Sequence, residues 1–360
     1  MALADCGLIE IIPSINHTLA NISHVTKALD GSGEGIAGVW TASDDTQAID
    51  RVYINVEAVN GTPPTYAVAI ETVTNTPTQG IPSGTDAGGG SPTSVDVTPG
   101  TWGTGSNEIT LTNPFTPTVG VAYAVTVRHS SGTVNAGACI DVYARQNEMA
   151  TYRATPSLAL LAATVWSSEA RRPVIAPIYE DNSIPLGFLP ITNMENDPWN
   201  TGDAPPLWKA NSFVLPVAHR VCGISLGARL YAAADVRVAI FNGAVEEVGM
   251  DITADMGWGT TAAGNPVHIS LPLTVLAANT TYHAAVKPLA ASDINYFYKW
   301  SFADLAKKRA VFGGNVSGST SPATVSWNDA NTVIYSISPV IDQIDGAGGV
   351  FPGFGGAGIV

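Results

Sequence analysis

The chain has 360 residues, 45% of them hydrophobic, which is enough to fill two ordinary domain cores, while only 13% are charged. With 30 acidic residues against 16 basic ones, the formal net charge is −14, so a nucleic-acid backbone would be repelled and no nucleic-acid partner is expected. The 36 glycines and 24 prolines favour short strands joined by turns over helices.

Residues 1–19 form a short apolar arm with a proline at position 13. The arm lacks the basic stretch and long apolar run of an export signal, so we expect folding in a cytoplasm. The longest apolar run, residues 158–166, is too short for a membrane span, which needs about 20 residues, so no membrane partner is expected.

Two long segments after the arm resemble each other, which predicts two copies of one domain. Their matched landmarks, in the same order, are Trp40 with Trp208, 66–70 with 236–240, Trp102 with Trp258, Tyr123 with Tyr282, and Trp166 with Trp327. We place the first domain at 20–182, a linker at 183–187, and the second domain, a repeat of the first, at 188–343.

Apolar and polar residues alternate along the expected strands, as in Val121, Tyr123 and Val125 against Ala122 and Ala124. One apolar and one polar face per strand is typical of a sheet packed on a second sheet. The predicted fold is therefore all-β, with two tandem antiparallel β-sandwich domains of jelly-roll type. Residues 157–165 and 302–311 could each form a short helix, and the glycine-rich run 84–90 predicts a flexible hairpin loop.

The three cysteines, Cys6, Cys139 and Cys222, are widely separated, and none has metal-ligand spacing to another. Cys139 and Cys222 lie within apolar strand patterns, so we expect small buried side chains rather than a disulfide framework. This pattern favours folding in a reducing compartment.

A search for catalytic and cofactor motifs gives no candidate, so we expect a protein that is not an enzyme and has no cofactor. Asp197, Asn200 and Asp203 are weak metal candidates for a Ca²⁺ site, with an ordinary Asp/Asn turn as the alternative. His268 and His283 fall on the polar faces of neighbouring expected strands, where exposed polar side chains are favoured over a metal-binding pair.

The recurring tryptophans have two interpretations. Packing of the sandwich cores is favoured because both copies keep them, and a platform that stacks on sugar rings is the functional alternative. Trp199 has no counterpart in the first copy and lies in a turn at the domain join, which makes it a candidate for an exposed contact.

Residues 344–360 form a glycine-rich tail that cannot build a core of its own. Phe351, Phe354, Ile359 and Val360 would be exposed apolar side chains if the tail stood alone. Either the tail is frayed, or these residues are interaction sites that dock onto another subunit.

Tandem Thr-, Gly- and Pro-rich sandwiches, an acidic chain and a glycine-rich apolar tail together resemble virion structural proteins of tailed bacteriophages, of the fibre, tail-tip or capsid-decoration type. The resemblance implies a non-enzymatic structural component that folds in the host cytoplasm and is built into the virion. It also implies a homo-oligomer with other virion proteins as partners, assembling through arm, tail and sandwich surfaces.

Two further classes of function remain open. A carbohydrate-binding adhesin or receptor-binding module would also be built of tandem jelly rolls and would bind a host-surface glycan. A polysaccharide-degrading enzyme is the third, although the chain offers no pair of carboxylates suited to glycoside hydrolysis.

Overall fold

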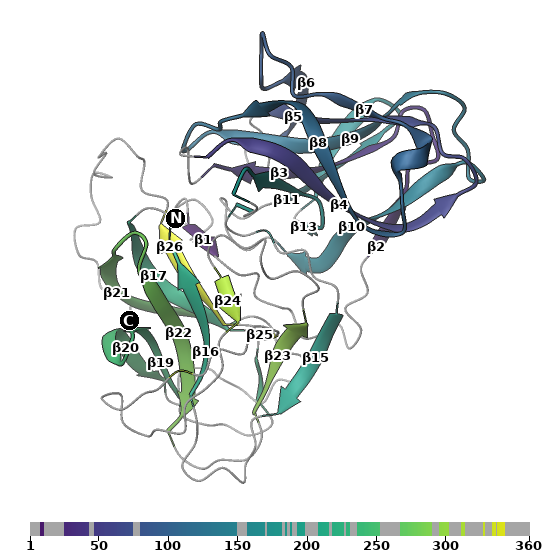
Figure 1. Ribbon diagram of the computed structural model, residues 1–360. Coiled ribbons are helices and arrows are strands. Elements are labelled where there is room, and N and C mark those ends of the chain that lie inside the picture. Colours follow the sequence, from purple (N-terminus) through teal and green to yellow (C-terminus); the bar gives the residue numbers. More distant parts are fainter. Residues whose placement is uncertain are drawn as a thin grey trace.

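The computed structural model describes residues 8–10, 25–42, 47–74, 80–149, 157–169, 171–181, 184–185, 188, 193–198, 208–215, 218–226, 228–230, 236–252, 267–289, 295–301, 311–313, 327, 333–335 and 337–342. Across these ranges the regular structure is antiparallel β-sheet, apart from one 3-10 turn at Pro99–Thr101, which confirms the all-β prediction. No helix in them is long and apolar enough to cross a membrane. Figure 1 shows one group of strands from the first half of the chain and another from the second half.

The first half, β2 to β14, forms two sheets. The seven-stranded sheet contains β12 (Val165–Glu169), β11 (Ser157–Ala162), β3 (Gly35–Thr41), β9 (Ala122–Ser131), β5 (Thr65–Thr74) and β6 (Ile81–Asp86), with β7 (Val95–Val97) paired to β5. The six-stranded sheet contains β13 (Arg171–Pro173), β10 (Cys139–Met149), β4 (Ile49–Asn60) and β14 (Ala176–Tyr179), with β2 (Val25–Ala28) on β10 and β8 (Gly105–Phe115) on β4. Both sheets contribute to one buried core, which includes Trp40, Tyr66, Val125, Val52, Ile109 and Ile178.

The second half, β15 to β26, forms three sheets. The five-stranded sheet runs β20 (Val245–Ile252), β19 (Val236–Asn242), β22 (Thr281–Pro288), β16 (Lys209–Val214), β24 (Val311–Gly313). A four-stranded sheet runs β1 (Leu8–Glu10), β26 (Ile337–Asp342), β17 (His219–Leu226), β21 (Val267–Leu276). A second four-stranded sheet contains β15 (Asn193–Pro198), β23 (Asn295–Ser301) and β18 (Ala228–Leu230), with β25 (Val333–Tyr335) on β23.

The two halves share one scheme of strand pairing. The order β3–β9–β5 in the first half matches β16–β22–β19 in the second, and β8–β4–β14 matches β21–β17–β26. Likewise β2 and β13 flank β10 as β15 and β25 flank β23. The matched strands also follow each other in the same chain order. This scheme is compatible with two tandem copies of one domain, while the domain boundaries stay predictions.

The register of the paired strands tests the landmarks residue by residue. Ile70 pairs with Val125 and Ile240 pairs with Ala284, so the alignment of 66–70 with 236–240 agrees with that of Tyr123 with Tyr282. The equation of Trp40 with Trp208 is wrong. Tyr123 pairs with Trp40, whereas Tyr282 pairs with Phe213, so Phe213 takes the place of Trp40. Two tryptophans that begin similar segments therefore lie at different positions of equivalent strands.

The predicted alternation of buried and exposed residues holds in some strands and fails in others. In β8 it holds, since Ile109 and Leu111 are buried between exposed neighbours. In β9 the second face is buried as well, including Ala124 and Thr126, because further side chains cover that face. Val121 was expected to face the core, but it precedes β9 in a turn and is 42% exposed.

The segment 157–165 is not the short helix that its composition allowed. Residues Ser157–Ala162 form β11, which pairs with β3 on one side and β12 on the other. Ala163 and Thr164 connect β11 to β12 with positive φ angles of 46° and 75°. Pairing with the exposed edge of β3 therefore outweighs local helix preference. Most of the second helix candidate, residues 302–310, lies outside the described residues.

In the glycine-rich run 84–90, residues 84–86 end strand β6, and a specific set of hydrogen bonds connects the turn that follows. The Asp86 carboxylate accepts bonds from the backbone N–H groups of Gly88, Thr93 and Ser94, at 2.8 to 3.0 Å. It also accepts one from the Thr93 hydroxyl at 3.1 Å. One side chain thus satisfies the backbone of the turn between β6 and β7.

The N-terminal arm joins the far half of the molecule. Its strand β1 pairs with β26, with Ile9 opposite Ile341 and Glu10 opposite Val340. Figure 1 places β1 beside β26 and away from β2, the next strand of the chain. The first described residues of the chain therefore lie against its last described strand.

Candidate functional site

The candidate site is one face of two equivalent sheets, the seven-stranded sheet of the first half and the five-stranded sheet of the second. We call it the outer face, because it lies opposite the face that carries Tyr123 and Tyr282. Buried polar and aromatic side chains gather there in both halves. Once Tyr123 and Tyr282 are superposed by register, Ala124 corresponds to His283, Thr126 to Ala285, and Arg128 to Lys287. On the neighbouring strands the same register equates Glu71 with Phe241. Continued one residue beyond the start of β16, it equates Gly35 with Trp208. These positions can therefore be compared one by one.

In the first half this face holds a buried carboxylate. Glu71 is 1% exposed, and its Oε1 accepts bonds from Arg128 Nη2 at 2.7 Å and Thr126 Oγ1 at 3.0 Å. Its Oε2 accepts the backbone N–H of Gly84 at 2.9 Å. Gly35 leaves room for the arginine stem, since a Cβ there would lie 3.1 Å from Arg128 Cγ. A buried charge that is paired and hydrogen-bonded in this way fixes β5, β9 and β6 relative to each other.

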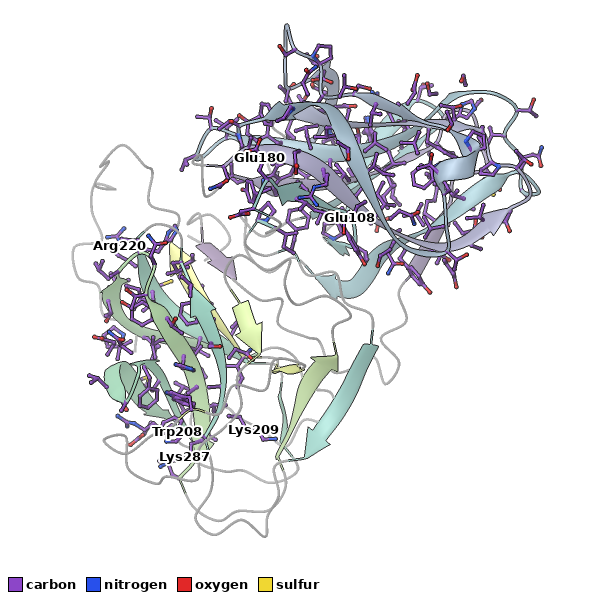
Figure 2. The ribbon with its side chains drawn as sticks, viewed as in Figure 1. Glu108, Glu180, Trp208, Lys209, Arg220 and Lys287 are labelled. Carbon is purple, nitrogen blue, oxygen red and sulfur yellow. The ribbon has the colours of Figure 1, made fainter. Side chains whose placement is uncertain are left out.

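In the second half, aromatic groups occupy the same face. Trp208 and Phe241 are fully buried, with ring centroids 5.0 Å apart at 80°. Lys287 Nζ lies over the Trp208 ring, 5.1 Å from its centroid. Figure 2 labels Trp208 and Lys287 at one end of the second half. Arg128 pairs with the Glu71 carboxylate in the first half, whereas Lys287, at the equivalent position of the second half, lies over the Trp208 indole.

Charged groups surround the Lys287 ammonium. Arg237 is its register partner on β19 and forms a bidentate pair with Glu246, with Nε–Oε2 and Nη2–Oε1 distances of 3.1 and 2.6 Å. Arg237 also bonds Asp251. Burial, followed by repulsion from Arg237, lowers the pKa of Lys287, and the hydrogen bond to Glu246 is the main cause that raises the pKa of Arg237. This side of the face is a network of compensated charges.

Trp327 covers the other end of the face. Its ring stacks on His283, with centroids 4.5 Å apart and planes 7° from parallel, and it meets Phe241 edge-on at 5.5 Å. Trp327 Nε1 donates to the Gly243 carbonyl at 2.8 Å, which fixes the indole on the β19–β20 turn. The ring is only partly buried. His283 is 5% exposed, so its expected place on an exposed polar face is wrong.

Trp166 and Trp327 pack over equivalent positions of this face, next to Ala124 and His283 respectively. Trp166 packs on the outer face of the first half against a small apolar cluster that includes Ala124, the counterpart of His283. Trp40, Trp102 and Trp208 are buried, and within the described structure their indole N–H groups have no hydrogen-bond acceptor. Packing is therefore their contribution, as the sequence favoured.

The metal and histidine predictions have different outcomes. His268 lies on β21 and His283 on β22, which belong to different sheets, so the two are not on neighbouring strands. Among the residues that the structure describes, no three His, Cys, Asp or Glu side chains could hold a metal ion together. Asp197 falls in β15, where only the backbone is described, and Asn200 and Asp203 lie outside the described residues.

The predicted interaction residues also lie outside the described residues: Trp199, Phe351, Phe354, Ile359 and Val360. Cys139 and Cys222 form no disulfide with each other. Cys139 is buried as expected, and Cys222 is partly exposed and donates a hydrogen bond from its Sγ to the Val340 carbonyl at 3.3 Å.

Sequence reasoning missed Glu71, Arg128, Phe241 and Lys287. The available signal was a single charged residue within an apolar strand, as in Glu71 after Tyr66–Ile70 and Lys287 after Tyr282–Val286. A lone charge of this kind must find a partner if the strand is covered on both faces.

Comparison with protein-family models, curated proteins and solved structures gave no match to this chain. What the protein does must therefore be inferred from its own residues.

Proposed function

We propose that the chain is a non-enzymatic structural component of a phage particle, which assembles through its arm, its tail and its sandwich surfaces. The observation that carries the proposal is the pairing of β1 with β26, by which the N-terminal arm completes a sheet of the far half. Arms that cross to another sheet add backbone hydrogen bonds and are a simple means of joining sandwich units.

The use of polar groups within the sheets supports a scaffold role. Glu71 forms its bonds with Arg128, Thr126 and the Gly84 backbone. Arg237 forms ion pairs with Glu246 and Asp251. Each of these pairs connects neighbouring strands, so the charges stabilise sheet geometry. A net charge of −14 also opposes nonspecific self-association of the chain before it is assembled.

The test is the mass in solution of the full-length chain and of a version that ends at Asp345. We expect the full-length protein to form a defined oligomer, and removal of residues 346–360 to abolish it. Sedimentation velocity over a concentration series measures both. If both proteins remain monomers at every concentration, the structural proposal loses its basis.

A second candidate is a carbohydrate-binding adhesin or receptor-binding module, which the partly exposed Trp327 favours. Its indole is fixed by His283 and by the Gly243 carbonyl, and a fixed aromatic ring is a suitable surface for a sugar ring. Binding of the monomer to a glycan array, abolished by Trp327→Ala and kept by Trp166→Ala, would support this candidate. Absence of any glycan signal from the folded wild type would exclude it for the glycans on the array.

A further inference from the structure

The contact between β1 and β26 is a short stretch of antiparallel backbone pairing. Three residue pairs define it: Leu8 with Asp342, Ile9 with Ile341, and Glu10 with Val340. Strand β26 is otherwise a core strand, with Ile337 and Ile341 fully buried, and β17 pairs with its other side. β1 therefore covers the outer edge of a strand that the second half needs for its own core.

The segment that leads into each half contacts the other half. Ile184 and Phe188 precede β15, yet both are 3% exposed within the core of the first half, where Phe188 meets Trp40 edge-on at 6.1 Å. The leading arm of the first half pairs with β26 of the second. Such reciprocal contacts are what two single-domain molecules would make if they exchanged their leading segments.

The two leading segments differ in how they are tethered. Ile184 follows β14 closely, so its contact is imposed by the chain. β1 is joined to β2 only through residues 11–24, which can span at most about 50 Å when fully extended. The same three residue pairs can form within one molecule or between two, so their intrinsic stability does not distinguish the alternatives.

Concentration then decides which pairing forms. A short tether gives its own strand an effective concentration on the order of millimolar at the acceptor edge. In dilute solution the arm pairs within its own chain. Where copies are held side by side, as in a particle, the arm of a neighbour is available at a comparable concentration.

We propose that β1 is exchanged between molecules on assembly, so that Leu8–Glu10 of one copy pairs with Val340–Asp342 of a second copy. The inference rests on the proposed structural function and specifies the interface that it would use. The strand that pairs with the free edge of β26 then comes from a second copy of this chain. The arm therefore changes from pairing within one molecule to connecting two molecules.

The experiment uses two single-cysteine variants of the full chain, with Cys6, Cys139 and Cys222 replaced by alanine. One carries Ile9→Cys and the other Ile341→Cys. Directly opposed residues of an antiparallel pair have Cα atoms about 4.5 to 5.5 Å apart, which suits a disulfide. Any bond between the two variants is intermolecular by construction. We expect a covalent dimer on mixing and mild oxidation, at least tenfold more abundant at high than at low protein concentration.

A matched control replaces Ile341→Cys with Val275→Cys, a side chain that is 65% exposed on β21 and does not face β1. The single chain with both Ile9→Cys and Ile341→Cys checks that the site folds and should close internally in dilute solution. If that chain closes while the mixed variants give no more dimer than the control, exchange is refuted. If the double variant does not close either, the β1–β26 pairing itself is refuted, and the proposal with it.

Sedimentation of the same samples separates this inference from the proposed function. If the mixed variants form oligomers but give no more cross-linked dimer than the control, the exchange is overturned and the structural role stands. Monomers at every concentration overturn both.

Discussion

Replacing Arg128 with methionine tests whether the buried carboxylate of the first half depends on its partner. Methionine keeps much of the stem that packs over Gly35 and removes the guanidinium, leaving Glu71 at 1% exposure with only Thr126 and the Gly84 N–H as donors. Breaking a buried ion pair by removing one partner costs about 3 to 5 kcal/mol. Because the Arg128 side chain is itself 33% exposed, solvent screens the pair, and we expect a smaller loss of about 2 to 3 kcal/mol.

The assay is urea unfolding followed by tryptophan fluorescence. Trp40 and Trp102 report on the first half, and the reduced midpoint should appear without a change of slope, since the surface exposed on unfolding is the same. For a unit of this size, the midpoint temperature of thermal unfolding should fall by about 5 to 10 °C.

A double variant, Glu71→Leu with Arg128→Met, provides the control. It leaves no buried charge, so its stability should recover at least half of the loss seen in Arg128→Met. The Gly84 N–H loses its acceptor, whereas the Thr126 hydroxyl keeps the Ala69 carbonyl at 3.4 Å. The second half indicates that the sheet accepts such a change, because Phe241 occupies the position of Glu71 there. A loss under about 0.5 kcal/mol for Arg128→Met, or a double variant as unstable as the sum of its single changes, would refute the reasoning.

Three further predictions concern the first half. Asp86→Ala removes the acceptor that orders the turn after β6 and should cost about 2 kcal/mol, with faster proteolysis in residues 87–94 as the readout. Gly38→Ala places a Cβ 2.7 Å from the Ile175 carbonyl and should cost about 1 to 3 kcal/mol by urea unfolding, whereas Gly90→Ala meets nothing within 4 Å and should be nearly neutral. Burial raises the pKa of Tyr66, whose hydroxyl donates to the Leu29 carbonyl, so its neutral form stabilises the fold below about pH 10 and this contribution is lost above it. Tyr66→Phe should therefore be less stable than wild type at pH 8, and the difference should shrink as the pH rises past 10; a constant difference would contradict this.

The fold class could be predicted because its signals are local. Alternating residues such as Asn107, Ile109 and Leu111, and turn residues between the strands, are sufficient to predict antiparallel sheets. The repeat could be aligned to the correct register at Tyr123 and Tyr282, since both strands there keep the same apolar spacing. Trp40 and Trp208 misled the alignment because a shared residue type was taken as a shared position.

Other features depend on which segments meet in space. Alternation shows that the two faces of a strand differ, but it does not show whether the second face is covered, so the burial of His283 and Thr126 was missed. The β1–β26 pairing spans nearly the whole chain and involves three residue pairs, which is too short a match to be recognised in a sequence. Burial of Glu71 likewise depends on Arg128 and Gly84, each on a different strand.

The differences between the two halves bear on how the protein is used. Two copies of one strand scheme need not keep the same side chains on the outer face, and here Glu71 and Arg128 form an ion pair where Phe241 and Lys287 adjoin Trp208. The carboxylate of the first arrangement and Arg237 beside the second both have charged partners, so either arrangement would serve a scaffold. If the halves carried identical sites for one ligand, the corresponding positions would be expected to match. Their divergence, together with an arm that links one half to the other, supports the proposed structural role over a pair of identical ligand sites.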